Sequence, residues 1–157
     1  MLDLNATICE IVERSFPLLR DIEISCELTD AAEDYLASLD WRHPERREII
    51  LTFSAEDVKQ MPDAALVGCI VHELCHAEYD VVLSPSGFAA NDRRYASDAE
   101  FRSSHERDID LAVIRKGYGR ELLALQLYHN EHYEAYQISD GLTPEETERI
   151  ITSLTET

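Results

Sequence analysis

The segment HELCH at residues 72–76 contains two histidines that are four residues apart, with a glutamate between them. The apolar periodicity of this segment predicts a helix, where residues four apart share one face, so His72 and His76 can reach one metal ion. Neutral imidazole nitrogens favour Zn²⁺. Glu73 is rotated by about 100° from His72, beside the ion, where its carboxylate can take a proton from a metal-bound water. The pattern indicates a metal site with an adjacent base.

A zinc site needs a third protein ligand, and the next long predicted helix offers one. Glu106 and Asp110 are four residues apart on a stripe that is otherwise apolar and should face the interior. Buried carboxylates are costly unless they are paired or bind a metal. We therefore expect Glu106 to be the third ligand and Asp110 to accept a hydrogen bond that orients an imidazole. His105, on a neighbouring face, and Asp108, on the far side, are the alternatives to Glu106.

The HExxH pattern followed by ExxxD resembles the gluzincin-type metallopeptidases, over about residues 49–120. The resemblance implies a zinc ion bound by His72, His76 and Glu106. It also implies that Glu73 is the general base and acid, and that Asp110 supports the ligands. The implied reaction is the hydrolysis of a peptide or protein substrate by a metal-activated water.

A peptidase also needs a place for an extended substrate and a donor for the oxyanion. The resemblance implies that the strand expected over Glu48–Ser54 is the sheet edge along which a peptide binds by strand addition. For the oxyanion donor, Tyr79, Tyr95 and Tyr118 are candidates because they neighbour the motif segments in the sequence.

A second function uses the same metal ligands. The chain could be a zinc-binding regulatory or interaction module of peptidase-like fold with little or no turnover, which its short length of 157 residues motivates. Glu73 favours the enzyme, because a purely structural site needs no base and usually has four protein ligands. A latent enzyme, with the acidic tail at residues 155–157 filling the cleft, is a third possibility.

Composition and charge narrow the partners. A chain of 157 residues with 45% hydrophobic residues is typical of a single globular domain over residues 1–157. Its formal net charge of −18 repels phosphate backbones and anionic lipids, so we expect no nucleic-acid or membrane partner. No apolar run is long enough to span a bilayer and no signal segment opens the chain, so we expect a cytoplasmic protein. The oligomeric state stays open.

Hydrophobic periodicity and chain-breaking residues predict the elements that position these residues. Alternation predicts a strand over residues 21–28, and nearly continuous apolar character predicts another over 48–54. Turn-forming residues over 81–97 predict a loop. Helices are expected over residues 3–16, 31–39, 55–61, 64–79, 98–116, 120–138 and 144–154. This order indicates an α+β fold in which a small N-terminal β-sheet packs on a mainly helical, zincin-like domain.

Overall fold

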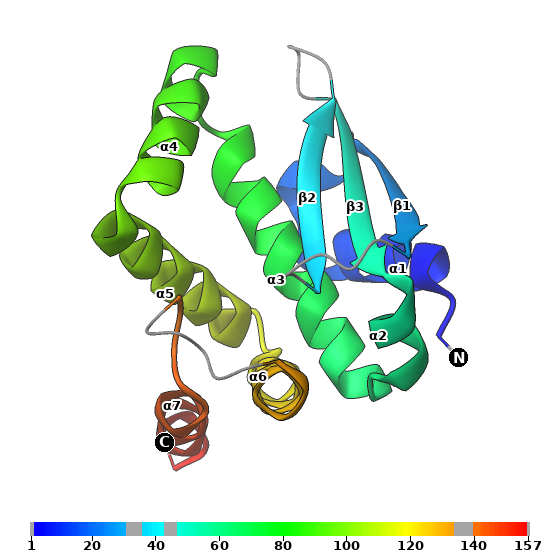
Figure 1. Ribbon diagram of the computed structural model, residues 1–157, viewed down its shortest axis with the longest axis vertical. Coiled ribbons are helices and arrows are strands. Elements are labelled where there is room, and N and C mark those ends of the chain that lie inside the picture. Colours follow the sequence, from blue (N-terminus) through cyan, green and yellow to red (C-terminus); the bar gives the residue numbers. More distant parts are fainter. Residues whose placement is uncertain (1, 31–35, 43–46, 134–139, 157) are drawn as a thin grey trace.

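The computed structural model describes residues 2–30, 36–42, 47–133 and 140–156. Near the N-terminus three strands form one sheet, and helices make up most of the rest, so the predicted α+β fold class is confirmed (Figure 1). No helix in these ranges is both long and apolar enough to cross a membrane. The elements in chain order are α1 (Leu4–Ser15), the short 3-10 turn η1 (Pro17–Leu19), β1 (Glu23–Thr29), β2 (Ala37–Arg42), β3 (Glu48–Ser54), α2 (Ala55–Gln60), α3 (Asp63–Val81), α4 (Pro85–Ser97), α5 (Ala99–Arg115), α6 (Gly119–His132) and α7 (Pro144–Thr155).

The sheet has the strand order β1-β3-β2, so β3 is its central strand. β1 runs parallel to β3 and β2 runs antiparallel to it, with Leu39 opposite Leu51. The expectation that Glu48–Ser54 forms the sheet edge is therefore wrong. Ile49, Ile50 and Leu51 are all buried, as the nearly continuous apolar character of a strand covered on both faces requires.

The edge strand on the side of α3 and α4 is β2, in a place where a helix over residues 31–39 was expected (Figure 1). Residues 31–35 lie outside the described residues, and Ala37–Arg42 is a strand. Its apolar residues Ala37, Leu39 and Trp41 alternate with polar ones, which is the period of a strand with one half-buried face. The helical prediction is wrong for residues 37–39, where this alternation, and not the possible cap at residues 29–30, indicates the observed structure.

The expected loop over 81–97 is also wrong, because residues 85–97 form the helix α4. Ser84 caps it by accepting a hydrogen bond from the Gly87 amide at 3.1 Å, and Pro85 occupies the first turn. A serine followed by proline is a typical helix start, so these residues begin a helix rather than a loop. The expected helix over 120–138 is observed as α6 up to His132, and residues 134–139 lie outside the described residues.

The long helix α3 joins the sheet to the helices. It contacts β2, α5 and α6, and its residues Leu66, Ile70 and Leu74 are almost completely buried. Burial of such side chains is the main favourable contribution to folding, so the face of α3 that carries these three residues is held firmly in the core. The imidazoles of His72 and His76 lie toward α5 instead.

The helix α5 presents the predicted mixed stripe to α3. Asp98 caps its start by accepting a hydrogen bond from the Phe101 amide at 2.9 Å. Ile109 and Val113 are buried, as are the carboxylates of Glu106 and Asp110. The sequence prediction of two carboxylates on an inward-facing apolar stripe is thus confirmed.

Candidate metal centre

Two imidazole nitrogens and one carboxylate group converge between α3 and α5. The Nε2 atoms of His72 and His76 are 3.2 Å apart. Glu106 approaches with Oε2 at 3.1 Å from His72 Nε2 and with Oε1 at 3.3 Å from His76 Nε2. His72, His76 and Glu106 therefore form a group that can hold a metal ion. The rival third ligand Asp108 has an exposed side chain.

Two of these separations match those of a tetrahedral site. Two ligand atoms that are each about 2.0–2.1 Å from a zinc ion at the tetrahedral angle lie about 3.3 Å from one another. The two Nε2 atoms, 3.2 Å apart, and the pair His72 Nε2 and Glu106 Oε2, 3.1 Å apart, are close to this value, whereas the 3.3 Å contact of His76 Nε2 is with the other carboxylate oxygen, Oε1. The donor types and these two separations thus fit a small tetrahedral cation.

The hydrogen-bonding groups in this cluster do not satisfy one another. A carboxylate only accepts, so the 3.1 Å contact between Asp110 Oδ1 and His72 Nδ1 assigns the ring proton to Nδ1. In the neutral ring, Nε2 then has a lone pair that faces a second acceptor, Glu106 Oε2. Burial lowers the pKa of His72, but its hydrogen bonds with Asp110 and Glu106 outweigh burial and raise the pKa well above 6.5. A cation between these atoms, metal or proton, stabilises the cluster.

Glu106 is held in its ionised form. Burial raises the pKa of this carboxyl, but the hydrogen bonds with His72 and His76 outweigh burial and bring the pKa far below its ordinary value. A carboxylate must be deprotonated to bind a metal, so Glu106 is ready to act as a ligand.

Asp110 connects the metal ligands to the rest of the fold. Its Oδ1 contacts His72 Nδ1, and its Oδ2 accepts the backbone N–H of Leu142 at 2.8 Å. Only 4% of Asp110 is exposed, so both oxygens are engaged in a nearly dry environment. The predicted role of Asp110 in orienting an imidazole agrees with this geometry. Its second contact, with Leu142, carries no sequence signal because the two residues are far apart in the chain.

Glu73 is half-buried and faces the same cavity as the ligands. Burial raises the pKa of this carboxyl, the neighbouring His76 and His72 lower it, and Glu106 raises it, with a net increase. A base whose pKa is raised toward neutrality is better suited to accept and return a proton near pH 7.

A cavity of about 610 Å³ opens over the ligands. One wall is the edge strand β2, from Ala37 to Trp41, and the opposite wall comes from α4. His72, Glu73, His76 and Glu106 lie at its base. At the rim, the Trp41 indole N–H donates to Asp80 Oδ2 at 3.2 Å and ties β2 to the end of α3. The group that can bind a metal is thus accessible from a cleft beside a sheet edge.

The three tyrosines that were candidate oxyanion donors have different environments. The Tyr95 hydroxyl lies in the cavity and donates to Glu106 Oε1. Burial and the charge of Glu106 raise the pKa of Tyr95, so its hydroxyl stays protonated and can donate. Tyr79 is 39% exposed and is not among the residues that line the cavity.

Tyr118 does not reach the site. Its hydroxyl accepts from Arg14 Nη2 at 2.9 Å and hydrogen-bonds with Ser15 Oγ at 3.0 Å. Tyr118 is 5% exposed and does not line the cavity. Its candidacy as oxyanion donor is therefore wrong, because it follows the end of α5 and packs against α1.

His105, the other alternative to Glu106 as third ligand, is not in the group of described residues that can hold a metal ion. Its side chain is buried and lines the cavity beside the ligands. Its ring centroid is 5.3 Å from that of His76, and it stacks with Phe101 at 5.9 Å. Burial lowers the pKa of His105, so this ring is neutral near pH 7. Phe101, four residues before His105 on the same helix face, was the available signal for this packing.

No family model, characterised protein or solved structure matches this chain. The geometry of the metal centre and of its cleft is therefore what supports a function.

Proposed function

We propose that the protein is a zinc-dependent metallopeptidase of the gluzincin type, in which His72, His76 and Glu106 hold the metal and Glu73 is the general base. The observation that carries this proposal is the convergence of His72 Nε2, His76 Nε2 and the Glu106 carboxylate, with contacts of 3.1–3.3 Å, in the lining of a cleft that Glu73 shares. An ion held there has three protein ligands and a side that faces the cleft. That arrangement is typical of catalytic rather than structural zinc.

Zinc is the metal that best fits this donor set. Two imidazole nitrogens and one carboxylate oxygen make up a ligand set common to catalytic zinc, whereas magnesium and calcium prefer all-oxygen sites. When bound, zinc supplies a Lewis acid that polarises a carbonyl and lowers the pKa of a coordinated water to about 7.

The protein's own groups then move the protons. Glu73, with its raised pKa, accepts a proton from the attacking water and returns it to the leaving nitrogen. The Tyr95 hydroxyl stays protonated and lies within the cavity, so it can donate to the oxyanion that develops on the substrate. Asp110 holds the His72 ring in the orientation that directs Nε2 toward the ion.

An extended peptide is the substrate that the cleft suits. Within the described residues no strand pairs with the outer edge of β2, so its free backbone groups can pair with a peptide chain. Residues Ala37–Trp41 of this strand line the cavity that contains the ligands. A peptide added along β2 would thus pass directly over the proposed zinc ion.

The test is metal analysis combined with digestion of a mixed peptide library. We expect about one zinc ion per chain and metal-dependent cleavage that falls at least about 100-fold in Glu73→Gln, which retains zinc. Glu131→Gln is the control, because Glu131 is exposed on α6 and carries the same charge change. Undiminished cleavage by Glu73→Gln would refute the assignment of the base. Bound zinc with no cleavage at high protein concentration would identify a metal-binding module instead.

A further inference from the structure

The segment that leads into α7 touches the support of the metal centre. The backbone N–H of Leu142 donates to Asp110 Oδ2 at 2.8 Å. The other oxygen of Asp110 contacts Nδ1 of His72 at 3.1 Å. Two hydrogen bonds thus lead from the C-terminal segment to a metal ligand.

Gly141 lets this segment come so close. Its φ of +98° is in the left-handed region that favours glycine, and an added Cβ would lie 2.4 Å from Asp110 Oδ2. A side chain at this position would displace either the segment or the carboxylate. Gly117 offers a natural comparison, because it has a similar φ of +91° but an added Cβ there meets nothing within 4 Å.

Several contacts hold the segment against α5 and α6. Arg107 of α5 donates to the Gly141 carbonyl at 3.3 Å and forms two 2.9 Å hydrogen bonds with the Glu146 carboxylate. Gln126 of α6 donates to the carbonyl of Leu142, whose side chain is buried. Bidentate pairing of arginine with a carboxylate fixes both position and orientation.

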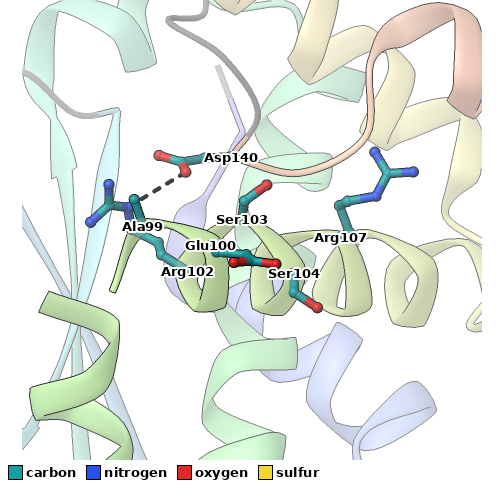
Figure 2. A pocket seen from close by; sticks show the side chains of 7 residues that line it. All are labelled: Ala99, Glu100, Arg102, Ser103, Ser104, Arg107 and Asp140. Carbon is teal, nitrogen blue, oxygen red and sulfur yellow. Dashed lines mark ion pairs between the residues drawn. The ribbon is translucent and has the colours of Figure 1, made fainter. Parts of the chain in front are cut away.

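Figure 2 shows the same segment from the side of α5. Asp140 lies across from Arg102, with which it forms an ion pair at 3.5 Å, and Arg107 extends from α5 beside the chain that leads to α7. The two arginines of α5 therefore hold the segment on both sides of Gly141.

We propose that Gly141 and the amide of Leu142 are positioning residues for the metal centre, so that docking of the C-terminal segment on α5 sets the metal affinity. This inference rests on the proposed metal site. Asp110 is nearly dry, and without the Leu142 amide its Oδ2 would lose its donor and the carboxylate would turn away from His72. Groups that hydrogen-bond to metal ligands typically contribute about 10–100-fold to metal affinity.

The direct experiment compares Gly141→Ala with Gly117→Ala. Both substitutions put a Cβ on a residue with positive φ, but only the first displaces Asp110. We expect the zinc dissociation constant, measured by competition with a chelator, to rise about 10-fold or more in Gly141→Ala and less than about twofold in Gly117→Ala. The visible spectrum of the Co²⁺-loaded protein should change in Gly141→Ala alone, because only there are the ligands reoriented.

A double-mutant cycle separates positioning from general support of the fold. In an Asp110→Ala background the carboxylate that Gly141 approaches is gone, so Gly141→Ala should weaken zinc binding no further. The inference would be overturned, and the proposed function left standing, by either of two results. One is an equal loss of zinc affinity from Gly141→Ala with and without Asp110, and the other is a Gly141→Ala variant that binds zinc as tightly as Gly117→Ala. A wild-type chain that binds no metal would overturn the proposed function and this inference with it.

A milder pair of variants covers the case in which Gly141→Ala does not fold. Glu146→Gln weakens the Arg107 contact that holds the segment, whereas Glu145→Gln makes the same charge change at an exposed neighbouring position. We expect zinc affinity to fall several-fold in Glu146→Gln and to stay unchanged in Glu145→Gln, with equal affinities in both variants contradicting the proposal.

Discussion

Two clusters of polar side chains, each built around a carboxylate, differ in whether hydrogen bonds within the protein satisfy all of their polar atoms. In the first, Asp57 of α2 accepts from the Tyr128 hydroxyl at 2.8 Å and from the Tyr133 hydroxyl at 2.7 Å. Burial raises the pKa of Asp57, but hydrogen bonds from Ser54, Tyr133 and Tyr128 outweigh burial and lower it below 3.8. Each oxygen of this carboxylate has a protein donor, so the cluster is complete without an ion.

In the second cluster, acceptors face one another. The neutral His72 ring donates a hydrogen bond from Nδ1 to Asp110. The lone pair on its Nε2 therefore faces the carboxylate of Glu106. Glu106 is buried like Asp57 and its Oε1 accepts from the Tyr95 hydroxyl, but its Oε2 faces His72 Nε2, which donates only when the His72 ring is charged. The comparison teaches that a buried carboxylate alone does not indicate a metal site. What distinguishes the candidate metal site is a pair of atoms, His72 Nε2 and Glu106 Oε2, that needs an added proton or a metal ion between them.

The largest expected effect is on metal binding in Glu106→Gln. The substitution removes a charged ligand. We therefore expect zinc affinity to fall by more than about 100-fold, which is the upper end of the effect of a group that only supports a ligand. Chelator competition measures this loss. Asp57→Asn is the matched control, since it neutralises a carboxylate in the other cluster and should leave zinc affinity unchanged. Equal zinc affinities in Glu106→Gln and the wild type would remove Glu106 from the site.

The converse effect is on stability in Asp57→Asn. The amide oxygen can still accept from one tyrosine hydroxyl, but the amide nitrogen cannot accept from the other. The proton of that part-buried hydroxyl then has lost its acceptor. We expect the free energy of unfolding of the metal-free protein to fall by about 1–3 kcal/mol in urea titrations. Tyr133→Phe, which removes one donor only, should cost less. No change in Asp57→Asn would mean that these hydrogen bonds do not stabilise the fold.

A pH dependence also separates the two clusters. Zinc binds only the neutral His72 ring. Because the pKa of His72 is raised above 6.5 in the metal-free protein, protons already compete with zinc for this ring at pH values above 6.5. Zinc affinity should therefore fall by about tenfold per unit as pH decreases below the raised pKa. The lowered pKa of Asp57 has the opposite sign. Its contribution to stability is fully present above 3.8 and is lost as pH falls through the lower, folded-state pKa.

At pH 5 the two clusters should therefore behave differently. Zinc is largely released, while the contribution of Asp57 to the free energy of unfolding is intact. Zinc titrations and urea unfolding of the metal-free protein at pH 5 and pH 8 measure both quantities. Zinc binding of equal strength at the two pH values would contradict the assignment of His72 as a ligand.

The site residues that the sequence placed on common helix faces are close to one another along a helix. His72 and His76 are separated by one turn of α3, and Glu106 and Asp110 by one turn of α5, so the period of 3.6 residues was enough to place each pair on one face. That both faces meet was inferred from the cost of burying carboxylates, and the observed distances agree with it.

The features that the sequence did not predict depend on contacts between distant segments or on short elements. The place of β3 at the centre of the sheet follows from its pairing with both β1 and β2, and β2 itself has only six residues. Tyr118 is near α5 in sequence, but its hydroxyl is held by Arg14 of α1. The approach of Gly141 to Asp110 joins two segments that no local pattern relates. The helix α4 had a local signal, Ser84-Pro85, which the turn-forming residues around it obscured.

The central claim is that one divalent ion is bound between α3 and α5. The most direct measurement is anomalous X-ray diffraction at the zinc absorption edge, from crystals of the full chain grown with zinc. The account predicts a single strong peak at about 2.0–2.2 Å from His72 Nε2, His76 Nε2 and a carboxylate oxygen of Glu106, with Glu73 beside it and not bound. A peak elsewhere in the molecule, or none at these three residues, would contradict the account.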